Sequence, residues 1–327
     1  MSSPETGIKI PAVVHLFRKQ INAQKWNRCV AKAINETPLA YTWVLDHLTP
    51  GWEALVFGDY EGVMPLPVSR RLGMKIIQMP PEVLTLGILS DNEAIIRQFP
   101  AILHHPALSD FRFIGYNGSP RQDHKPSFHQ ETTKQIQILP LKKKYTKLFR
   151  EYSQSHQRNI RLFQKKNGEI KTENSPATYL ELIKKVGEKR PEIYLPKGYR
   201  NKFQNMIAET IDKNQGQLLS VYQNNLPVAV AFFLSGNKRT IVWHLATSEG
   251  YQLKASFALI DHFIQGHAET DKILDFAGSS LPRVAEFNRR FGAITETYPS
   301  VTINRLPPVV KVIKHMKVWH RLKRFFH

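Results

Sequence analysis

The chain has 327 residues, of which 42% are hydrophobic and 22% are charged, a balance typical of a globular protein long enough for two cores. It begins without the charged segment and apolar run of a secretory signal, and apolar stretches such as Val228 to Leu234 are too short to span a bilayer. Cys29 is the only cysteine, which excludes an internal disulfide and a cysteine-rich metal site. We therefore expect a cytoplasmic protein that holds no metal.

The formal net charge of +19 calls for a polyanionic partner or for an extensive solvated basic surface. Much of the excess lies in two clusters, one from Lys142 to Lys166 and one from Lys311 to Arg324. Runs of this kind are often only the solvated faces of helices, and that alternative stays open for both clusters.

In chain order, the first half of the sequence predicts helices over 23–34 and near 41–47, followed by three strand-like runs within 52–79. Turn signals at Asp59 to Gly62 and at Arg71 to Gly73 separate these runs. Beyond them the pattern predicts a helix over 92–104 and strands over 111–115 and 133–139. A junction is expected near Leu141.

The second half predicts a strand over 169–172, helices near 178–186 and 202–213, and then three strands in a meander, "GQLLSVYQ", "LPVAVAFFLS" and "RTIVWHLATS". An amphipathic helix follows Gly250. The stretch "KILDFAGSSLPRVAEFNRRFGA" then predicts a strand, a polar turn and a helix, and "TETYPSVTIN" a last strand. Because 52–79 and 217–245 share the same spacing of three runs and two turns, we interpret the chain as an internal duplication.

Three motifs carry a resemblance to a known family. "SQSHQRNIRLFQKKNGEIK" has an Arg-Asn pair on a long helix before a basic stretch, a glycine and a strand, "LDFAGS" is followed by a helix ending in "FNRRFGA", and "WEALVFGDYEGVMPLPV" matches strands of the first half. In this order they resemble the tandem-GNAT family of the FemABX-like aminoacyltransferases and their BioF2-like acyltransferase relatives. The resemblance covers most of the chain up to Pro308.

The resemblance implies an α/β chain of two tandem GNAT-like domains, each a mixed, largely antiparallel sheet flanked by helices. The N-terminal domain, 1–141, would shape the acceptor side, and the C-terminal domain, 142–308, would hold the acyl donor. It also implies an N-acyltransferase that moves an acyl or aminoacyl group from acyl-CoA or aminoacyl-tRNA to an amine, such as that of a cell-envelope precursor. No tightly bound cofactor is implied.

The donor loop corresponds to "TSEGYQLKAS", in which Gly250 and Ala255 depart from the spacing of the family's phosphate-binding loop. An inactive binding or scaffold protein with this fold therefore remains an alternative. The donor-binding candidates are Thr247, Ser248, Gly250, Gln252, Lys254 and Ser256.

The catalytic candidates nearest the expected cleft are His244, Asp275, Glu286 and Tyr298. The substrate-binding candidates are Gly278, Ser279 and Arg289. For Asp275 the alternative is a carboxylate that accepts the N–H bonds of its own turn. For His244 the alternative is a core histidine with its hydrogen bonds satisfied.

Two partners are expected from the charge clusters. The Lys142 to Lys166 cluster suits a tRNA, whose binding would weaken with salt. The tail, 309–327, places apolar residues on one helical stripe with basic residues around it, which is typical of a helix that binds an anionic membrane surface. We therefore expect a cytoplasmic protein that associates peripherally with the inner membrane face, the alternative being a tail that packs on the protein's own core.

Overall fold

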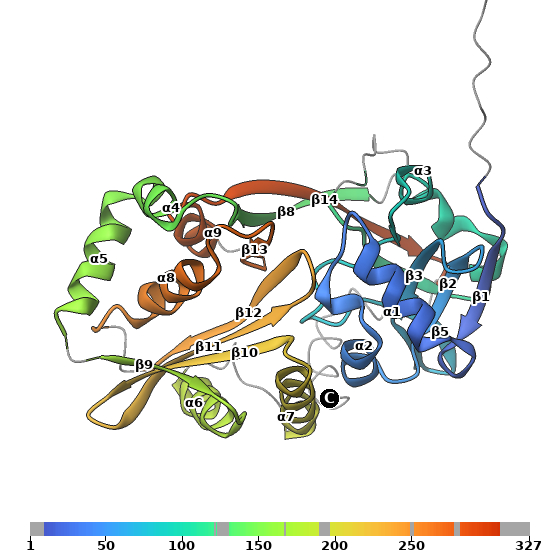
Figure 1. Ribbon diagram of the computed structural model, residues 1–327. Coiled ribbons are helices and arrows are strands. Elements are labelled where there is room, and N and C mark those ends of the chain that lie inside the picture. Colours follow the sequence, from blue (N-terminus) through green and yellow to red (C-terminus); the bar gives the residue numbers. More distant parts are fainter. Residues whose placement is uncertain are drawn as a thin grey trace, which may run out of the picture. The chain divides into compact units, whose positions relative to one another are not determined.

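The computed structural model describes residues 10–120, 122, 131–166, 168–189, 197–248, 252–277 and 282–307, with the side chains of 189 and 197–199 excepted (Figure 1). Contacts divide the chain into two compact units. Unit 1 comprises Met1–Asn35, Thr49–Thr133 and Tyr298–His327, and unit 2 comprises Glu36–Leu48 and Lys134–Thr297. Neither unit is a single continuous stretch of sequence.

Unit 1 contains two groups of strands. Four strands form an antiparallel sheet in the order β1-β2-β3-β6, and β4, β5 and β7 lie side by side in a second group. The elements are β1 (Val13–Phe17), η1 (Arg18–Gln20), α1 (Ala23–Lys32), β2 (Glu53–Phe57), β3 (Gly62–Leu66), β4 (Val68–Arg71), β5 (Met74–Gln78), β6 (Leu89–Ser90), α3 (Glu93–Ile96), η3 (Ala101–His104), η4 (Pro106–Leu108) and β7 (Phe113–Asn117).

The single helix predicted over 92–104 is wrong. The Asn92 side chain caps α3 by accepting from Ala94 N at 2.9 Å, but this helix ends at Ile96 and a 3-10 turn follows at Ala101–His104. The physical reason is Pro100, which has no N–H to donate and disfavours the helical conformation of the residue before it. The apolar period of a longer helix survives the break because both short pieces bury the same kind of residue.

Unit 2 is built on the strand order β8-β13-β12-β11-β10-β9. Its elements are η2 (Pro38–Ala40), α2 (Thr42–Leu48), α4 (Tyr145–Glu151), α5 (Gln154–Gln164), β9 (Glu169–Glu173), α6 (Ala177–Lys189), α7 (Lys197–Asp212), β10 (Gly216–Gln223), β11 (Leu226–Ser235), β12 (Arg239–Thr247), α8 (Ala255–His267), β13 (Ile273–Asp275) and α9 (Pro282–Arg289). Two long strands, β8 (Glu131–Pro140) and β14 (Ile294–Asn304), have residues in both units.

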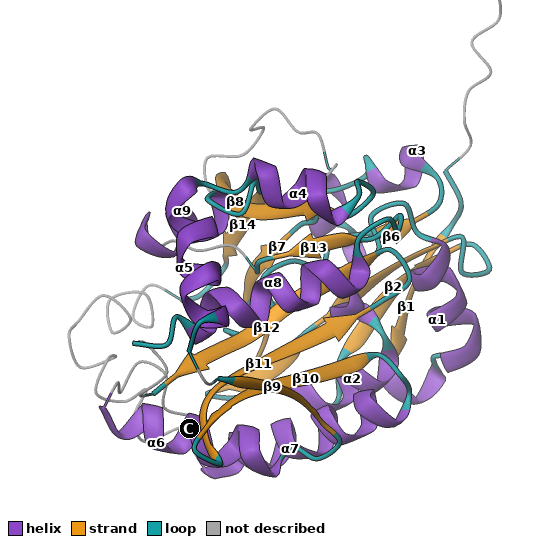
Figure 2. Cartoon of the chain, turned by 60° about the vertical axis from the view of Figure 1, so that its left-hand side comes forward, coloured by secondary structure: helices purple, strands orange, loops and turns teal. Residues whose placement is uncertain are grey.

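Helices cover both faces of the unit 2 sheet. Figure 1 shows α4, α5, α8 and α9 on one side of β10 to β13 and α6 and α7 on the other, and Figure 2 shows the same arrangement from a second direction. Phe233 of β11 stacks on Phe263 of α8 with ring centroids 4.1 Å apart, and Phe232 faces Tyr179 of α6. Alternate residues of one strand thus supply two apolar cores, which is why β11 is a continuous apolar run.

The two halves of the sequence exchange their last strands. In unit 2, β13 pairs in antiparallel fashion with β8, through partners such as Leu274 and Leu139, although β8 precedes Leu141 in the chain. In unit 1, β7 pairs with β14, through partners such as Tyr116 and Val301. The boundary predicted at Leu141 therefore falls between elements that the contacts assign to the same unit.

A second exchanged segment, Glu36–Leu48, also belongs to unit 2. The buried Glu36 carboxylate accepts hydrogen bonds from Asn237 N at 2.6 Å, from Lys238 N at 2.5 Å and from the Tyr41 hydroxyl at 2.7 Å. This carboxylate accepts the backbone hydrogen bonds of the turn between β11 and β12. A residue of the first half of the sequence thereby fixes the hairpin that precedes β12.

Candidate functional site

The parallel strands β12 and β13 separate after a short contact. Their register pairs Arg239–Ile241 with Ile273–Asp275. Beyond Ile241, β12 continues to Thr247 paired with β11 and no longer with β13. In the part of the chain that the structure describes, no strand pairs with Val242–Thr247 on the β13 side. The carboxyl half of β12 is therefore an open strand edge, of the kind to which an extended ligand can add.

Backbone donors and acceptors face this open side. Ser248 N donates to Val228 O of β11 at 3.0 Å, which fixes the direction of its peptide groups. Because successive residues of an antiparallel strand turn their N–H and C=O groups to opposite sides, those of Leu245 and Thr247 point away from β11. These groups are available to pair with amides of a ligand.

A β-bulge lies beside the open edge. The register of β11 against β12 shifts between Phe232 and Phe233, which oppose His244 and Val242, so that Trp243 is the extra residue. Trp243 and His244 consequently both contact Phe203 of α7, with ring centroids 5.7 and 5.4 Å away. The bulge thus places two consecutive side chains of β12 on the α6 and α7 face.

His244 lies in an aromatic environment and is neutral at pH 7. Its ring stacks on Tyr179 with centroids 5.8 Å apart, and Nδ1 forms a hydrogen bond with the Tyr179 hydroxyl. Burial lowers the pKa of His244 to about 4 and raises the pKa of Tyr179 well above its ordinary value. A base of such low pKa accepts a proton poorly at neutral pH, so this geometry suits hydrogen bonding better than general-base catalysis.

Both oxygens of Asp275 have partners. Oδ2 forms an ion pair with Arg239 Nη1 at 2.7 Å, and Oδ1 accepts from Ala277 N at 2.8 Å, where the chain turns with a φ of 59°. Arg239 also contacts Glu296 at 3.3 Å. This carboxylate holds its own turn and the start of the parallel pair, which is the structural alternative considered from the sequence.

The other candidates occupy different surroundings. Glu286 is partly exposed on α9 and pairs with both Arg289 and Arg290 at 2.9 Å, and these hydrogen bonds lower its pKa. Arg289, expected to bind substrate, is therefore engaged by Glu286. Tyr298 is buried on β14 and belongs to unit 1, whereas the other catalytic candidates belong to unit 2. His244, Asp275 and Glu286 each bond to a different neighbour, and their catalytic roles stay predictions.

The structure brings several donor-binding candidates together at the start of α8. Thr247 Oγ1 lies 2.6 Å from Ser256 Oγ, which links the end of β12 to the first turn of the helix. Lys166, from the basic cluster, donates to Gln252 O at 2.8 Å. Lys254 precedes the helix with a φ of 63°. Positive charge from two parts of the sequence thus lies around the loop that leads into α8.

Gly250, Gly278, Ser279 and the tail 309–327 lie outside the described residues. Within the described ranges, no group of three or more His, Cys, Asp or Glu side chains could hold a metal ion. None of the helices described has the length and apolar character needed to cross a membrane.

Two contacts near the open edge were not predicted from the sequence. Tyr179 belongs to a helix whose apolar period says nothing of its bond to His244. Arg239 opens β12 directly before its buried residues, and a charge at such a position is a signal in the sequence for a buried carboxylate partner, which is Asp275.

Comparison with known proteins finds solved structures of similar fold and no match by sequence. No family model matches the chain, and no curated protein matches it. Among solved structures, FemX matches at 13% identity and a TM-score of 0.66, covering 93% of this chain and 100% of FemX. A conserved protein of unknown function from Bacteroides thetaiotaomicron matches at 11% identity and 0.58, covering 86% of this chain and 97% of that one.

A third match is the C-terminal domain of an Agrobacterium fabrum protein that its description assigns provisionally to the lysylphosphatidylglycerol synthetases. It has 8% identity and a TM-score of 0.57, and the match covers 87% of this chain and 92% of that domain. Identity this low establishes architecture and leaves activity to be argued from the site. The expected FemABX-like fold is confirmed: the chain is similar in fold to FemX along nearly its whole length and has a mixed α/β architecture.

Proposed function

We propose that this chain is an N-acyltransferase that moves an acyl or aminoacyl group from an activated donor to a primary amine. The observation that carries the proposal is the open edge of β12, which runs from the short parallel contact with β13 to the loop before α8. The likeness to FemX supports the fold in which this edge occurs. The reaction forms a C–N bond and breaks the thioester or ester bond of the donor. The proton lost by the neutral amine ends on the leaving group, which departs as the CoA thiol or the tRNA hydroxyl.

Acyl-CoA fits the open edge in two respects. The amides of its pantetheine arm can pair with the outward backbone groups of Leu245 and Thr247 as an added strand. Its phosphates carry negative charge that Lys166 and Lys254, beside the loop before α8, can neutralise. His244, next to Leu245 and held by Tyr179, is a positioning residue in this proposal, because its low pKa suits a neutral hydrogen-bonding ring.

An aminoacyl-tRNA is the second donor class, favoured by a basic surface on α4 and α5. Arg158, Arg161 and Lys165 recur at helical spacing and are exposed, as are Lys147 and Arg150 on the preceding helix. Phosphate binding by such side chains is sequence-independent and falls steeply with salt. For the acceptor, the resemblance to FemABX chains makes a cell-envelope amine the first class to test.

The decisive experiment uses two substitutions at Thr247. Thr247→Pro removes the outward N–H, which a strand edge tolerates, whereas Thr247→Val keeps the N–H and loses only the hydroxyl contact with Ser256. Calorimetric titration of the full chain with acetyl-CoA, longer acyl-CoAs, and charged and uncharged tRNA gives the donor. We expect at least about tenfold weaker binding of the true donor by the proline variant and an effect below about threefold for valine.

Two outcomes would contradict the proposal. If the chain binds neither acyl-CoA nor charged tRNA in preference to uncharged tRNA, the inactive binding protein becomes the better explanation. If both Thr247 variants bind the donor as well as the native chain, the open edge is not its site. When a donor binds, mass spectrometry of amine mixtures incubated with donor and protein identifies the acceptor class.

Membrane association through the tail, 309–327, is a separate part of the proposal. Its motivation is the basic, amphipathic sequence of this segment. Full-length protein should pellet with vesicles that contain anionic lipid, and a chain ending at Pro308 should stay in the supernatant. Equal pelleting of the two would remove this part and leave the acyltransferase proposal untouched.

A further inference from the structure

A cavity of about 430 Å³ opens in unit 1 between α1, the turn that joins β2 to β3, and the residue that follows β6. Six charged side chains line it: Lys25, Arg28, Lys32, Asp59, Glu61 and Asp91. A volume of this size is within the range of small-ligand sites. The site described above is built from residues of unit 2, so this cavity is a separate feature.

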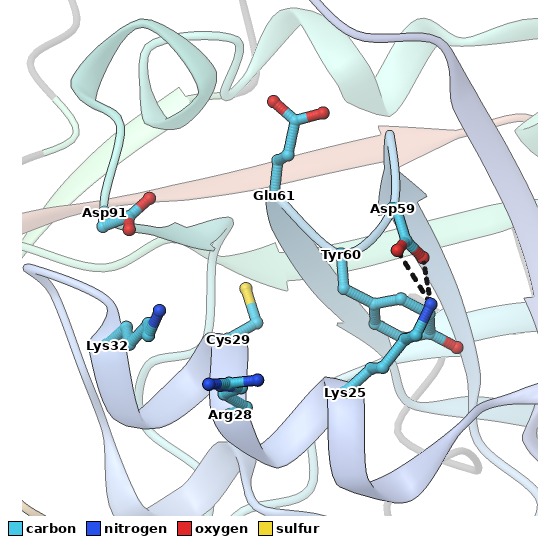
Figure 3. A pocket seen from close by; sticks show the side chains of 8 residues that line it. All are labelled: Lys25, Arg28, Cys29, Lys32, Asp59, Tyr60, Glu61 and Asp91. Atoms are coloured by element: carbon cyan, nitrogen blue, oxygen red, sulfur yellow. Dashed lines mark hydrogen bonds and ion pairs between the residues drawn. The ribbon is translucent and has the colours of Figure 1, made fainter.

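The cavity has walls of opposite charge. Lys25, Arg28 and Lys32 are three and four residues apart on α1, a spacing that places them along one face of the helix. Figure 3 shows these three side chains along α1, with the carboxylates of Glu61 and Asp91 across the opening from Arg28 and Lys32. The arrangement offers a cationic wall and an anionic wall to the same ligand.

Some of these charges satisfy one another and others do not. Lys25 forms an ion pair with Asp59 at 2.7 Å, which closes one end of the cavity. Among the residues that the structure describes, no ion pair engages Arg28, Glu61 or Asp91. One guanidinium and two carboxylates thus remain for a ligand that carries both signs of charge.

Contacts of Tyr60 and Cys29 hold the frame of the cavity. The Tyr60 hydroxyl accepts from Asn22 N at 2.8 Å, which ties the β2–β3 turn to the start of α1. The Cys29 thiol lies between the two walls and interacts with Leu89 O at 3.7 Å. Burial, reinforced by Asp91, raises the pKa of Cys29 to about 12, so the thiol stays protonated and unreactive at pH 7. The cavity therefore suits the binding of a ligand, and its thiol does not act as a nucleophile.

We propose that this cavity binds a small zwitterion of short-peptide size, with its carboxylate on Arg28 and Lys32 and its primary ammonium between Glu61 and Asp91. A carboxylate accepts charge-assisted hydrogen bonds from a guanidinium, and an ammonium donates them to carboxylates. A neutral or singly charged molecule would leave one wall uncompensated. Because all of the lining charges are exposed, binding is weak and falls as salt screens them.

The test separates the two ends of the ligand. The full chain is titrated at low salt with L-alanyl-L-alanine, with its N-acetyl form, which lacks the ammonium, and with its C-terminal amide, which lacks the carboxylate. Two variants, Arg28→Gln and Asp91→Asn, each neutralise one wall. Arg97→Gln, at an exposed arginine directly after α3 and outside the cavity, is the matched control.

The native chain should bind the free dipeptide at least about tenfold more tightly than either blocked form. Arg28→Gln should abolish the preference over the amide and keep the preference over the N-acetyl form. Asp91→Asn should do the reverse, and Arg97→Gln should change neither. Donor binding should be unaffected by all three variants, which separates this test from that of the acyltransferase.

The proposal is overturned if the free dipeptide fails to bind at millimolar concentration, or if it binds no better than its blocked forms. It is also overturned if the two wall variants lower affinity for all three probes equally, because that result would indicate a general loss of structure. Retention of both preferences in both variants would place the dipeptide elsewhere on the chain.

Discussion

The two strand meanders of the chain end in different ways. In the first half, β5 pairs in parallel with β7 through Ile76, Ile77 and Gln78, and β5 ends at the last of these residues. In the second half, β12 pairs in parallel with β13 over an equally short stretch and then continues to Thr247. The same pairing scheme therefore leaves an open strand edge in only one of the two places described.

Prolines explain the difference. Pro80 and Pro81 follow β5 by one residue and supply no N–H groups, so the strand cannot extend as a pairing edge. Pro67 also separates β3 from β4, which pair in different sheets. The second meander has no proline in β12. Two regions with the same strand pairing scheme can thus differ in whether they leave the strand edge that a ligand would need.

The largest expected effect concerns the start of the β12 and β13 pair. Asp275→Ala would leave Arg239 buried with only the more exposed Glu296, and removing one partner of a buried ion pair costs about 3–5 kcal/mol. Urea unfolding followed by circular dichroism measures the loss. Glu286→Ala, which breaks the two surface pairs with Arg289 and Arg290, is the control and should cost far less. A stable Asp275→Ala protein without activity would instead make Asp275 catalytic.

His244 of β12 should make the free energy of unfolding depend on pH. The corresponding strand of the first half, β5, contains no histidine and should make no such contribution. The unfolded imidazole gains a proton near pH 6.5 and the folded one only near pH 4, so the unfolded state binds more protons between these values. Stability should therefore fall as pH falls through this window, by about 3 kcal/mol from this residue.

His244→Gln should flatten that part of the profile in urea titrations from pH 7.5 to pH 4. His156, whose pKa is also lowered to about 4 by burial, keeps its own contribution in both proteins, and the difference between them isolates His244. Parallel profiles for the native chain and the variant would show that His244 is protonated normally in the fold.

Glu36 tests whether the turn before β12 needs support from the first half of the sequence. Glu36→Gln removes the negative charge that two short backbone bonds approach and should cost about 2 kcal/mol of unfolding free energy, because hydrogen bonds to charged groups are worth about 1.5–3 kcal/mol. Glu93→Gln, in an exposed pair of α3, should cost less than about 1 kcal/mol. If the two variants lost the same unfolding free energy, the turn before β12 would not depend on the Glu36 carboxylate.

Much of the fold could be predicted from local patterns, and the exceptions are physical. Alternating and continuous apolar runs located the second meander and the helix that follows it. Short elements such as β1, β6 and α4 lack enough residues for a clear period. The exchange of β8 and β14 is a choice of long-range partner, which no local pattern encodes.

The candidate site was less predictable for the same reason. Thr247 and Ser256 are close in sequence and do meet, as the loop position suggested. Asp275 pairs with Arg239, at the first residue of β12, and His244 bonds to Tyr179, on helix α6. Both partners are distant in the sequence. Residue type alone marked these side chains as chemically capable, but only tertiary contacts show how far each is already engaged.

The smallest expected effect comes from exchanging residues between two hairpin turns of the same kind. Leu72 and Gly73 join β4 to β5 with φ angles of 49° and 75°, and Asn224 and Asn225 join β10 to β11 with 50° and 61°. Such turns need a positive φ at both central residues, which asparagine tolerates better than leucine.

Leu72 is 72% exposed, so its replacement removes little buried apolar surface. Leu72→Asn should therefore stabilise the chain by about 1 kcal/mol and Asn224→Leu should destabilise it by a similar amount, as thermal and urea unfolding can measure. Effects of equal sign would show that burial at the turns outweighs backbone conformation, and the two hairpins would then differ in more than their central residues.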